Sequence, residues 1–282
     1  MIVSSALRRI LPTLVTVAAM LVAAPTNAAP EDDRGAMVRM FQSRFPGVPL
    51  DDYVYGGLMF NAAARRHYED IMAFPPFEPD LDRGKALWET PFRNGRTYAD
   101  CLPDGGRMIA GRYPTYDAQA KRLVTFEMLL NDCRSNNGEA AYRFDDRDTM
   151  GVLTAYARSL SDGMRMDIRV DSPEALARYE SGKALFHRRI GQMNFSCANC
   201  HVTNAGKIMR METVSPALGQ ATHFPVFRGG DSLYTLHARY TRCMQQVRAQ
   251  PFAMGSDAFN DLEYFHSYLS NGLPLKASVY RR

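Results

Sequence analysis

The sequence predicts an all-α protein in which two tandem domains of similar plan follow an N-terminal helical extension. Apolar residues recur at helical rather than alternating spacing, and an internal repeat divides most of the chain into two copies. The length of 282 residues is sufficient for two domains of ordinary size. A content of 46% hydrophobic and 23% charged residues is typical of folded proteins.

Residues 1–28 have the pattern of a secretory signal peptide. Arg8 and Arg9 form a basic start, residues 11–24 an apolar stretch, and Thr26-Asn27-Ala28 a cleavage site. The alternative is a membrane anchor, but about fourteen apolar residues are too few where a bilayer span takes ~20. We therefore expect export to the periplasm, cleavage, and a mature chain without a membrane span.

The charge of the mature chain is close to neutral. Removal of residues 1–28 lowers the formal charge from +4 to +2, with 32 basic residues against 30 acidic ones. No block rich in lysine and arginine alternates with aromatic residues. Nucleic acid is therefore excluded as an expected partner.

The extension, residues 29–76, is expected to hold two helices that serve packing. The first ends at Phe45-Pro46-Gly47, and the second ends at Phe74-Pro75-Pro76, because proline disfavours helix at the preceding residue. Four apolar residues at helical spacing belong to the second helix: Leu58, Met59, Ala62 and Ala63.

Four blocks of the remaining sequence recur in the same order. The sequence GKALW at 84–88 returns 98 residues later as GKALF at 182–186, and the other three blocks return 99, 110 and 109 residues later. These three blocks carry the following residues in the first copy: Cys101, then Leu123, Thr125 and Cys133, then Leu153, Leu160, Ser161 and Gly163. We interpret this pattern as a duplicated domain, with copies at 77–165 and 166–282.

Each copy is expected to contain a helix, a cysteine loop, a middle helix and a C-terminal helix. In the second copy, Ser172-Pro173-Glu174 supplies an N-cap, a proline at the first helical position and an acidic first turn. The last helix begins near Ser256-Asp257 and ends at Asn271-Gly272. Nothing in the sequence suggests an extended sheet.

The motif Cys197-Ala198-Asn199-Cys200-His201 indicates covalent attachment of haem c. Cys197 and Cys200 provide the two thiols for thioether bonds, and His201 provides the proximal iron ligand. A thioredoxin-like redox motif would be expected near a βαβ pattern, and a zinc site would need a second Cys/His pair nearby. Neither accompanies the motif, so both domains are expected to be cytochrome c-like.

The first copy has lost this motif, since Tyr98 stands in place of Cys197 and Leu102 in place of His201. We therefore expect a single haem. The first copy retains Cys101 and Cys133, and in an exported protein we expect a Cys101–Cys133 disulfide in place of the lost cofactor. Two free buried thiols are the alternative.

Cys243 is the remaining cysteine, and the repeat places it where a cytochrome c domain supplies its distal ligand. A thiolate ligand would lower the reduction potential of the iron. Other residues of ligand type remain alternatives: Met209, Met211, Met244, Met254, His223 and His237.

Arg239 lies four residues before Cys243 and therefore on the same face of a helix. A guanidinium there favours a thiolate and can hold a dianion through paired hydrogen bonds. Arg242 and Arg248 are also close in sequence, and for these the alternative is a solvated helix face.

These features together resemble the SoxA family, the larger subunits of periplasmic SoxAX cytochromes of thiosulfate oxidation. The resemblance covers nearly the whole mature chain and is most specific at 197–201 and 239–244. Because the chain departs from the dihaem members at Tyr98 and Leu102, it looks like the monohaem branch.

The resemblance implies an L-cysteine S-thiosulfotransferase. Thiosulfate would be joined oxidatively to a cysteine of a SoxYZ carrier protein, while two electrons leave through haem. Cys243 would be the catalytic residue, found as a persulfide in the family, and Arg239 would contact the substrate. A small SoxX cytochrome would form the heterodimer and supply another haem.

Two other functions remain open at this point. One is a plain electron-transfer cytochrome in which Cys243 only tunes the potential of the haem. The other is a thiosulfate dehydrogenase that couples two thiosulfate ions to tetrathionate.

Overall fold

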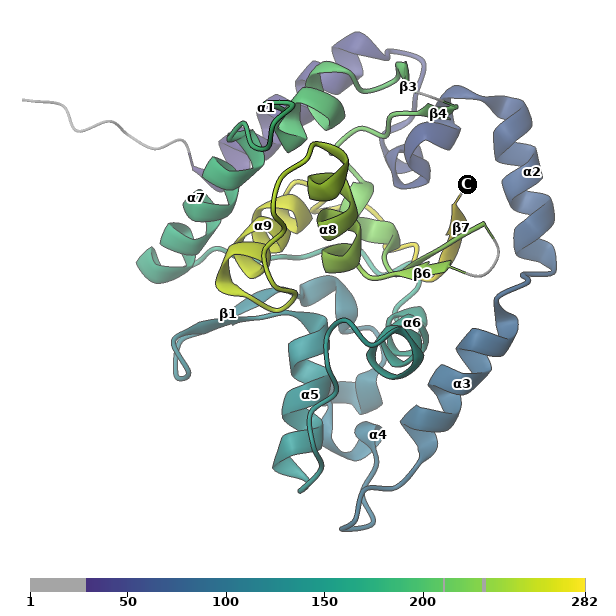
Figure 1. The fold of residues 1–282 in the computed structure, drawn as a ribbon, viewed down its shortest axis with the longest axis vertical. Coiled ribbons are helices and arrows are strands. Elements are labelled where there is room, and N and C mark those ends of the chain that lie inside the picture. The colour runs from purple at the N-terminus through teal and green to yellow at the C-terminus, as the bar shows by residue number, and fades with distance from the viewer. Residues whose placement is uncertain (1–28, 210, 230–231, 282) are drawn as a thin grey trace, which may run out of the picture.

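The computed structural model describes residues 29–209, 211–229 and 232–281, and it is mostly helical (Figure 1). The helices in chain order are α1 (Pro30–Arg44), α2 (Ala62–Ala73), α3 (Glu78–Glu89), α4 (Tyr98–Cys101), α5 (Phe126–Asn136), α6 (Val152–Ser159), α7 (Pro173–His187), α8 (Leu236–Gln246) and α9 (Asp257–Tyr268). The expected signal peptide, residues 1–28, lies outside the described residues. Within the described ranges, no helix is both long and apolar enough to cross a membrane.

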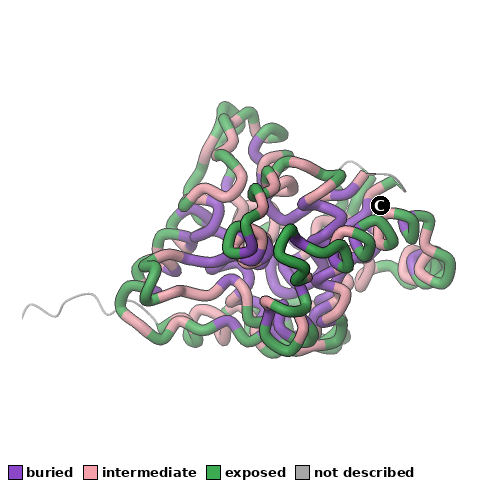
Figure 2. The backbone as a smooth tube through the Cα atoms, turned by 90° about the horizontal axis from the view of Figure 1, so that it is seen from below, coloured by how far each residue is buried: buried purple, intermediate pink, exposed green. Residues whose placement is uncertain are grey.

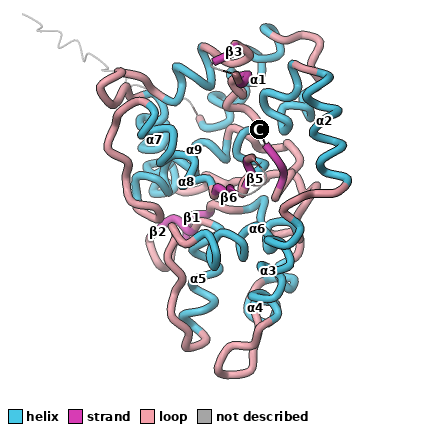
Figure 3. Tube along the Cα trace, turned by 45° about the vertical axis from the view of Figure 1, so that its right-hand side comes forward, coloured by secondary structure: helices cyan, strands magenta, loops and turns pink. Residues whose placement is uncertain are grey.

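Short strands, which the sequence pattern did not indicate, accompany the helices. They are β1 (Thr115–Asp117), β2 (Arg122–Val124), β3 (Ile208–Met209), β4 (Glu212–Thr213), β5 (Val226–Arg228), β6 (Ser232–Tyr234) and β7 (Val279–Arg281). They pair as β1-β2, β3-β4 and β6-β5-β7, and β5 and β7 run parallel. Figure 3 shows β1, β2, β5 and β6 in the middle of the molecule, between α3–α5 and α7–α9.

The repeated glycine of the GKALW and GKALF blocks lies at a helix crossing in each half. Helix α3 packs across α6, and α7 packs across α9 (Figure 1). A Cβ atom on Gly84 would overlap the carbonyl oxygen of Val152, and one on Gly182 would overlap that of Asp261. The absence of a side chain therefore permits this close approach of two helices.

Repeated serine and threonine residues make corresponding hydrogen bonds in the two halves. The Ser161 hydroxyl accepts from the backbone N–H of Ala110 at 3.1 Å, and the Ser270 hydroxyl accepts from that of Gly219 at 3.1 Å. Thr125 and Thr235 cap α5 and α8 with their side chains. The serine and threonine residues that recur in the two sequence copies therefore make equivalent hydrogen bonds in the two halves of the structure.

Aromatic side chains fill the first half where the second half carries its haem motif. The buried Tyr98 ring stacks on Trp88 with centroids 5.4 Å apart and meets the edge of Phe92 at 5.0 Å. The predicted Cys101–Cys133 disulfide is confirmed, with a Cα–Cα distance of 6.0 Å. This bond ties α4 to α5.

The extension differs from its prediction in one respect. Leu58 and Met59 do not belong to the second helix but to η1 (Leu50–Phe60), a 3-10 segment. Asn61 then interrupts the chain with extended backbone, and its side-chain oxygen accepts from the Ala64 N–H at 3.0 Å to begin α2. The helical spacing of apolar residues continues across the Asn61 cap, from Leu58 to Ala63, and for that reason the sequence predicted one helix there.

The extension packs against the motif-bearing half. Arg44, at the end of α1, donates to the carbonyls of Val202 at 2.9 Å and Ala205 at 2.8 Å. The backbone N–H of Gly57 in η1 donates to the hydroxyl of Ser215 at 3.0 Å. Figure 2 shows that the buried segments gather in the interior, with exposed segments around them.

Candidate functional site

A cavity of about 470 Å³ lies in the second half of the chain. Helices α7, α8 and α9, the loop before α8 and strand β7 all contribute to its lining. The structure brings together in this lining all the residues that the sequence predicted for the haem and substrate site: Cys197, Cys200, His201, Arg239 and Cys243.

His201 is oriented by a backbone carbonyl. Its Nδ1 lies 2.9 Å from the carbonyl oxygen of Ser215. A carbonyl can only accept, so Nδ1 carries the proton and the lone pair is left on Nε2. Burial lowers the pKa of His201 to about 4, with a smaller contribution from the charge of Arg239, so the ring stays neutral. Neutral imidazole with its second nitrogen bonded to a carbonyl is the usual state of a metal-ligating histidine.

The two motif cysteines are free and neutral. Neither Cys197 nor Cys200 is part of a disulfide. Burial raises the pKa of Cys197 to about 12 and also raises that of Cys200. Two unpaired thiols, together with a histidine whose Nε2 is available, line a cavity in the size range of small-molecule sites. The residues present therefore fit haem c.

Helix α8 presents Arg239 and Cys243 to the cavity from one face, as their spacing predicts. Arg239 is half-buried, and in the described part of the chain its guanidinium has no carboxylate partner. Arg242 and Arg248 are exposed and do not line the cavity. Of these three arginines, Arg239 is the one whose position allows contact with a molecule bound in the cavity.

The alternative distal ligands divide into two groups. Met209, Met211, Met244 and His223 line the cavity, whereas Met254 and His237 do not. The Nδ1 atom of His237 instead accepts from the Gly255 N–H at 3.1 Å, and its Nε2 lies 2.9 Å from a Glu263 carboxylate oxygen.

Several residues of the lining were not predicted from the sequence. Ser215 fixes His201 through a backbone carbonyl, which any residue type could supply, so no sequence signal marks it. Gln220, Arg228 and Arg281 also line the cavity and come from three separate elements. Arg281 lies far from the motif in sequence, and only folding brings it there.

A mostly helical chain whose haem-attachment motif, candidate distal cysteine and arginine line one cavity has the fold and site of a c-type cytochrome. A family model described as "SoxA/TsdA, cytochrome c domain" matches residues 83–166. This match implies haem c as the cofactor of the class.

The L-cysteine S-thiosulfotransferase subunit SoxA of Chlorobaculum tepidum is 40% identical over 257 residues, which cover 91% of this chain and 89% of that protein. The SoxA subunit of Allochromatium vinosum is 40% identical over 277 residues, covering 97% and 98%. The crystal structure of SoxXA from P. pantotrophus superposes with a TM-score of 0.70 at 28% identity, covering 77% of this chain and 84% of that chain. The chain belongs to the SoxA family of L-cysteine S-thiosulfotransferase subunits.

Proposed function

We propose that this chain is the monohaem SoxA subunit of a periplasmic enzyme that joins thiosulfate to a cysteine of a SoxYZ-type carrier. A SoxX-type cytochrome would be its heterodimer partner. The observation that carries the proposal is the meeting of Cys197, Cys200, His201, Arg239 and Cys243 in one cavity. The relatives named as L-cysteine S-thiosulfotransferase subunits support the reaction type.

The proposed organisation is an extension at 29–76, a haem-less cytochrome c-like domain at 77–165 and a haem-binding one at 166–282. Equivalent glycines at the α3/α6 and α7/α9 crossings support this division. The stacked Trp88 and Tyr98 rings and the Cys101–Cys133 disulfide support a first domain without haem, because they occupy or bridge the corresponding positions.

Each residue of the site has a separate proposed role. Cys197 and Cys200 would hold haem through thioether bonds, and His201 would ligate the iron through Nε2. Cys243 would be the distal ligand and the catalytic sulfur. When bound, haem c supplies a centre that accepts electrons one at a time.

The overall reaction has a simple balance. The carrier thiol and the outer sulfur of thiosulfate form one S–S bond, which releases two electrons. Haem c held by Cys197, Cys200 and His201 would supply their acceptor, with the partner cytochrome as the next one. The proton of the carrier thiol passes to solvent. The guanidinium of Arg239 donates to the sulfonate oxygens of thiosulfate, which orients the outer sulfur toward Cys243 and offsets the cost of bringing a dianion into a partly buried cavity.

One haem c per chain is the first expected result. The chain has a single Cys-x-x-Cys-His motif, because in the first half Tyr98 replaces the first thiol and Leu102 replaces the histidine. A pyridine haemochrome assay on the purified protein measures the ratio, and a Cys197→Ala, Cys200→Ala variant serves as the haem-free control. A ratio of two haems per chain would contradict the monohaem assignment.

Arg239→Lys is expected to reduce catalytic efficiency roughly ten- to hundredfold, since losing a charged hydrogen bond costs about 1.5 to 3 kcal/mol. Lysine keeps the charge but lacks the planar pair of donors. The haem spectrum should barely change. Steady-state assays with thiosulfate and the carrier measure the effect.

Arg242→Lys is the matched control for this experiment, because Arg242 is exposed on the same helix and does not line the cavity. It should retain full activity. Full activity in both Arg239→Lys and Arg239→Ala would remove Arg239 from the substrate site.

A further inference from the structure

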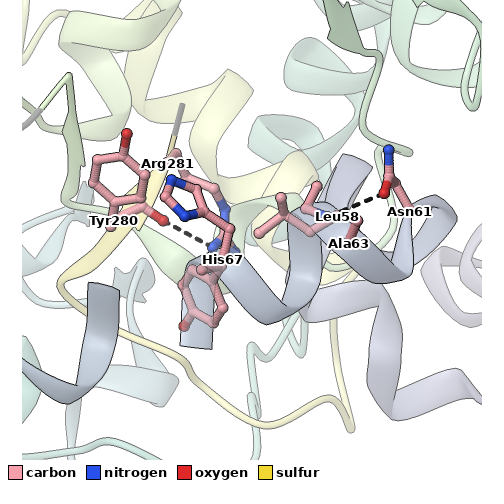
Figure 4. Close-up of a pocket in the computed structure, with 8 residues that line it drawn as sticks. Leu58, Asn61, Ala63, His67, Tyr280 and Arg281 are labelled. Carbon is pink, nitrogen blue, oxygen red and sulfur yellow. Dashed lines mark hydrogen bonds between the residues drawn. The ribbon is translucent and has the colours of Figure 1, made fainter. Parts of the chain in front are cut away.

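Arg281 is a buried cation that lies between a cavity and a surface pocket. It lies on β7, next to β5, and is 9% exposed. It lines the cavity of the motif and also a surface pocket of about 300 Å³ between α2 and β7. Figure 4 shows Arg281 in this surface pocket, with Tyr280 and His67 close by.

The hydrogen bonds of Arg281 leave its charge without a counter-ion. One Nη donates to the carbonyl of Val54 at 2.8 Å and the other to that of Tyr280 at 3.1 Å, and Nε has no partner. In the described ranges, no carboxylate pairs with this guanidinium. Burial lowers the pKa of Arg281 to about 10, so the side chain remains a cation at neutral pH.

A buried cation without an anion is costly, which suggests that its counter-ion comes from a bound group. Two other buried polar side chains share the cavity lining with it. One is Gln220, whose side-chain oxygen Oε1 has no hydrogen-bond partner. The other is His223, whose pKa is lowered mainly by burial and secondly by the positive charge of Arg281. One part of the lining is therefore polar and cationic, in contrast to the thiols and apolar side chains elsewhere.

Haem c carries the complementary charge. Its vinyl groups are consumed by the two thioether bonds, and its propionate carboxylates are anionic at neutral pH. We infer that Arg281 binds one haem propionate through the guanidinium N–H groups that its two carbonyl contacts leave unused. Arg281 is thus a positioning residue that holds this carboxylate ionised. The inference rests on the proposed placement of haem c in this cavity.

The test is a spectroelectrochemical titration of the haem at several pH values. In the wild-type protein, Arg281 keeps the pKa of the propionate low, so the potential should change little through the neutral range. In Arg281→Gln, the propionate pKa rises and the carboxylate titrates near neutral pH. The potential should then fall as the pH rises, because an ionised carboxylate favours ferric iron.

The expected size is at least a tenfold change in the ferric-to-ferrous ratio at a fixed ambient potential, or ~59 mV for a one-electron couple. Arg281→Lys keeps the charge but not the planar donors, so it should shift the propionate bending band in the resonance Raman spectrum and change the potential less. The lysine variant decides the question if the glutamine variant does not fold.

Arg165→Gln is the control. Arg165 is an exposed arginine that pairs with Asp51 and does not line the cavity. Its replacement should leave the potential and its pH profile unchanged.

Two results would overturn the inference. One is a wild-type potential, pH profile and propionate band in both Arg281 variants. The other is weakened thiosulfate binding with an unaltered haem, which would assign Arg281 to the substrate. A wild-type protein without haem would refute the proposed function instead, and the haem assay detects that case beforehand.

Discussion

Replacing Cys243 with serine is expected to abolish the conjugation of thiosulfate to the carrier cysteine, with turnover falling at least about a thousandfold. The proposed chemistry needs a polarisable sulfur at this point of the cavity, and a hydroxyl neither binds the iron as a thiolate does nor exchanges sulfur bonds. Mass spectrometry of the carrier after incubation with thiosulfate measures the product directly.

The haem content should not change in this variant, because Cys197, Cys200 and His201 remain, whereas the low-spin spectrum of a histidine/thiolate pair should be lost. The control is the double replacement Cys101→Ala, Cys133→Ala, which removes the disulfide of the first half and should keep activity. If Cys243→Ser conjugates thiosulfate normally, the protein is an electron relay. If it produces tetrathionate from thiosulfate alone, the carrier reaction is not its function.

Gly182→Ala is expected to have the largest effect on stability. The new Cβ would overlap the carbonyl oxygen of Asp261, so α7 and α9 would have to move apart along their crossing. We expect a loss of about 3 kcal/mol or more, the upper range for overpacking. Thermal unfolding followed by circular dichroism and by the haem absorption measures this loss.

Gly35→Ala in α1 is the control, since a Cβ there meets only the flexible side chain of Arg39, at 3.2 Å. It should be neutral or stabilise the protein by up to about 1 kcal/mol, because alanine is the better helix former. An equal loss in both variants would show that glycine matters through backbone conformation and not through the crossing.

The haem motif and the repeat could be found from the sequence because both depend on local spacing. Cys197, Cys200 and His201 are close in the chain whatever the rest of the fold does, and the repeat aligned Cys101 with Cys200 and Cys133 with Cys243 before any contact was known. The Cys101–Cys133 disulfide followed from that alignment and is present in the structure.

The remaining features depend on tertiary contacts. Leu58 and Met59 continue the apolar spacing of α2, but the backbone breaks at Asn61, and a helical pattern does not report such a break. Ser215 acts through its carbonyl, and Arg281 reaches the cavity only because β7 pairs with β5. The short strands have too few residues for alternation to be recognised.

The contacts of the extension limit how independent the motif-bearing half is. The carbonyl of Ser215 orients the His201 ring, and the hydroxyl of Ser215 accepts from the Gly57 N–H, 158 positions earlier in the chain. Arg44 donates to the carbonyl of Val202, in the loop after His201. A fragment of 166–282 would contain every recognisable haem residue and yet lack the segment that steadies the ligand. The motif is therefore a poor guide to where this protein could be cut or grafted, since the contacts that support it begin in α1.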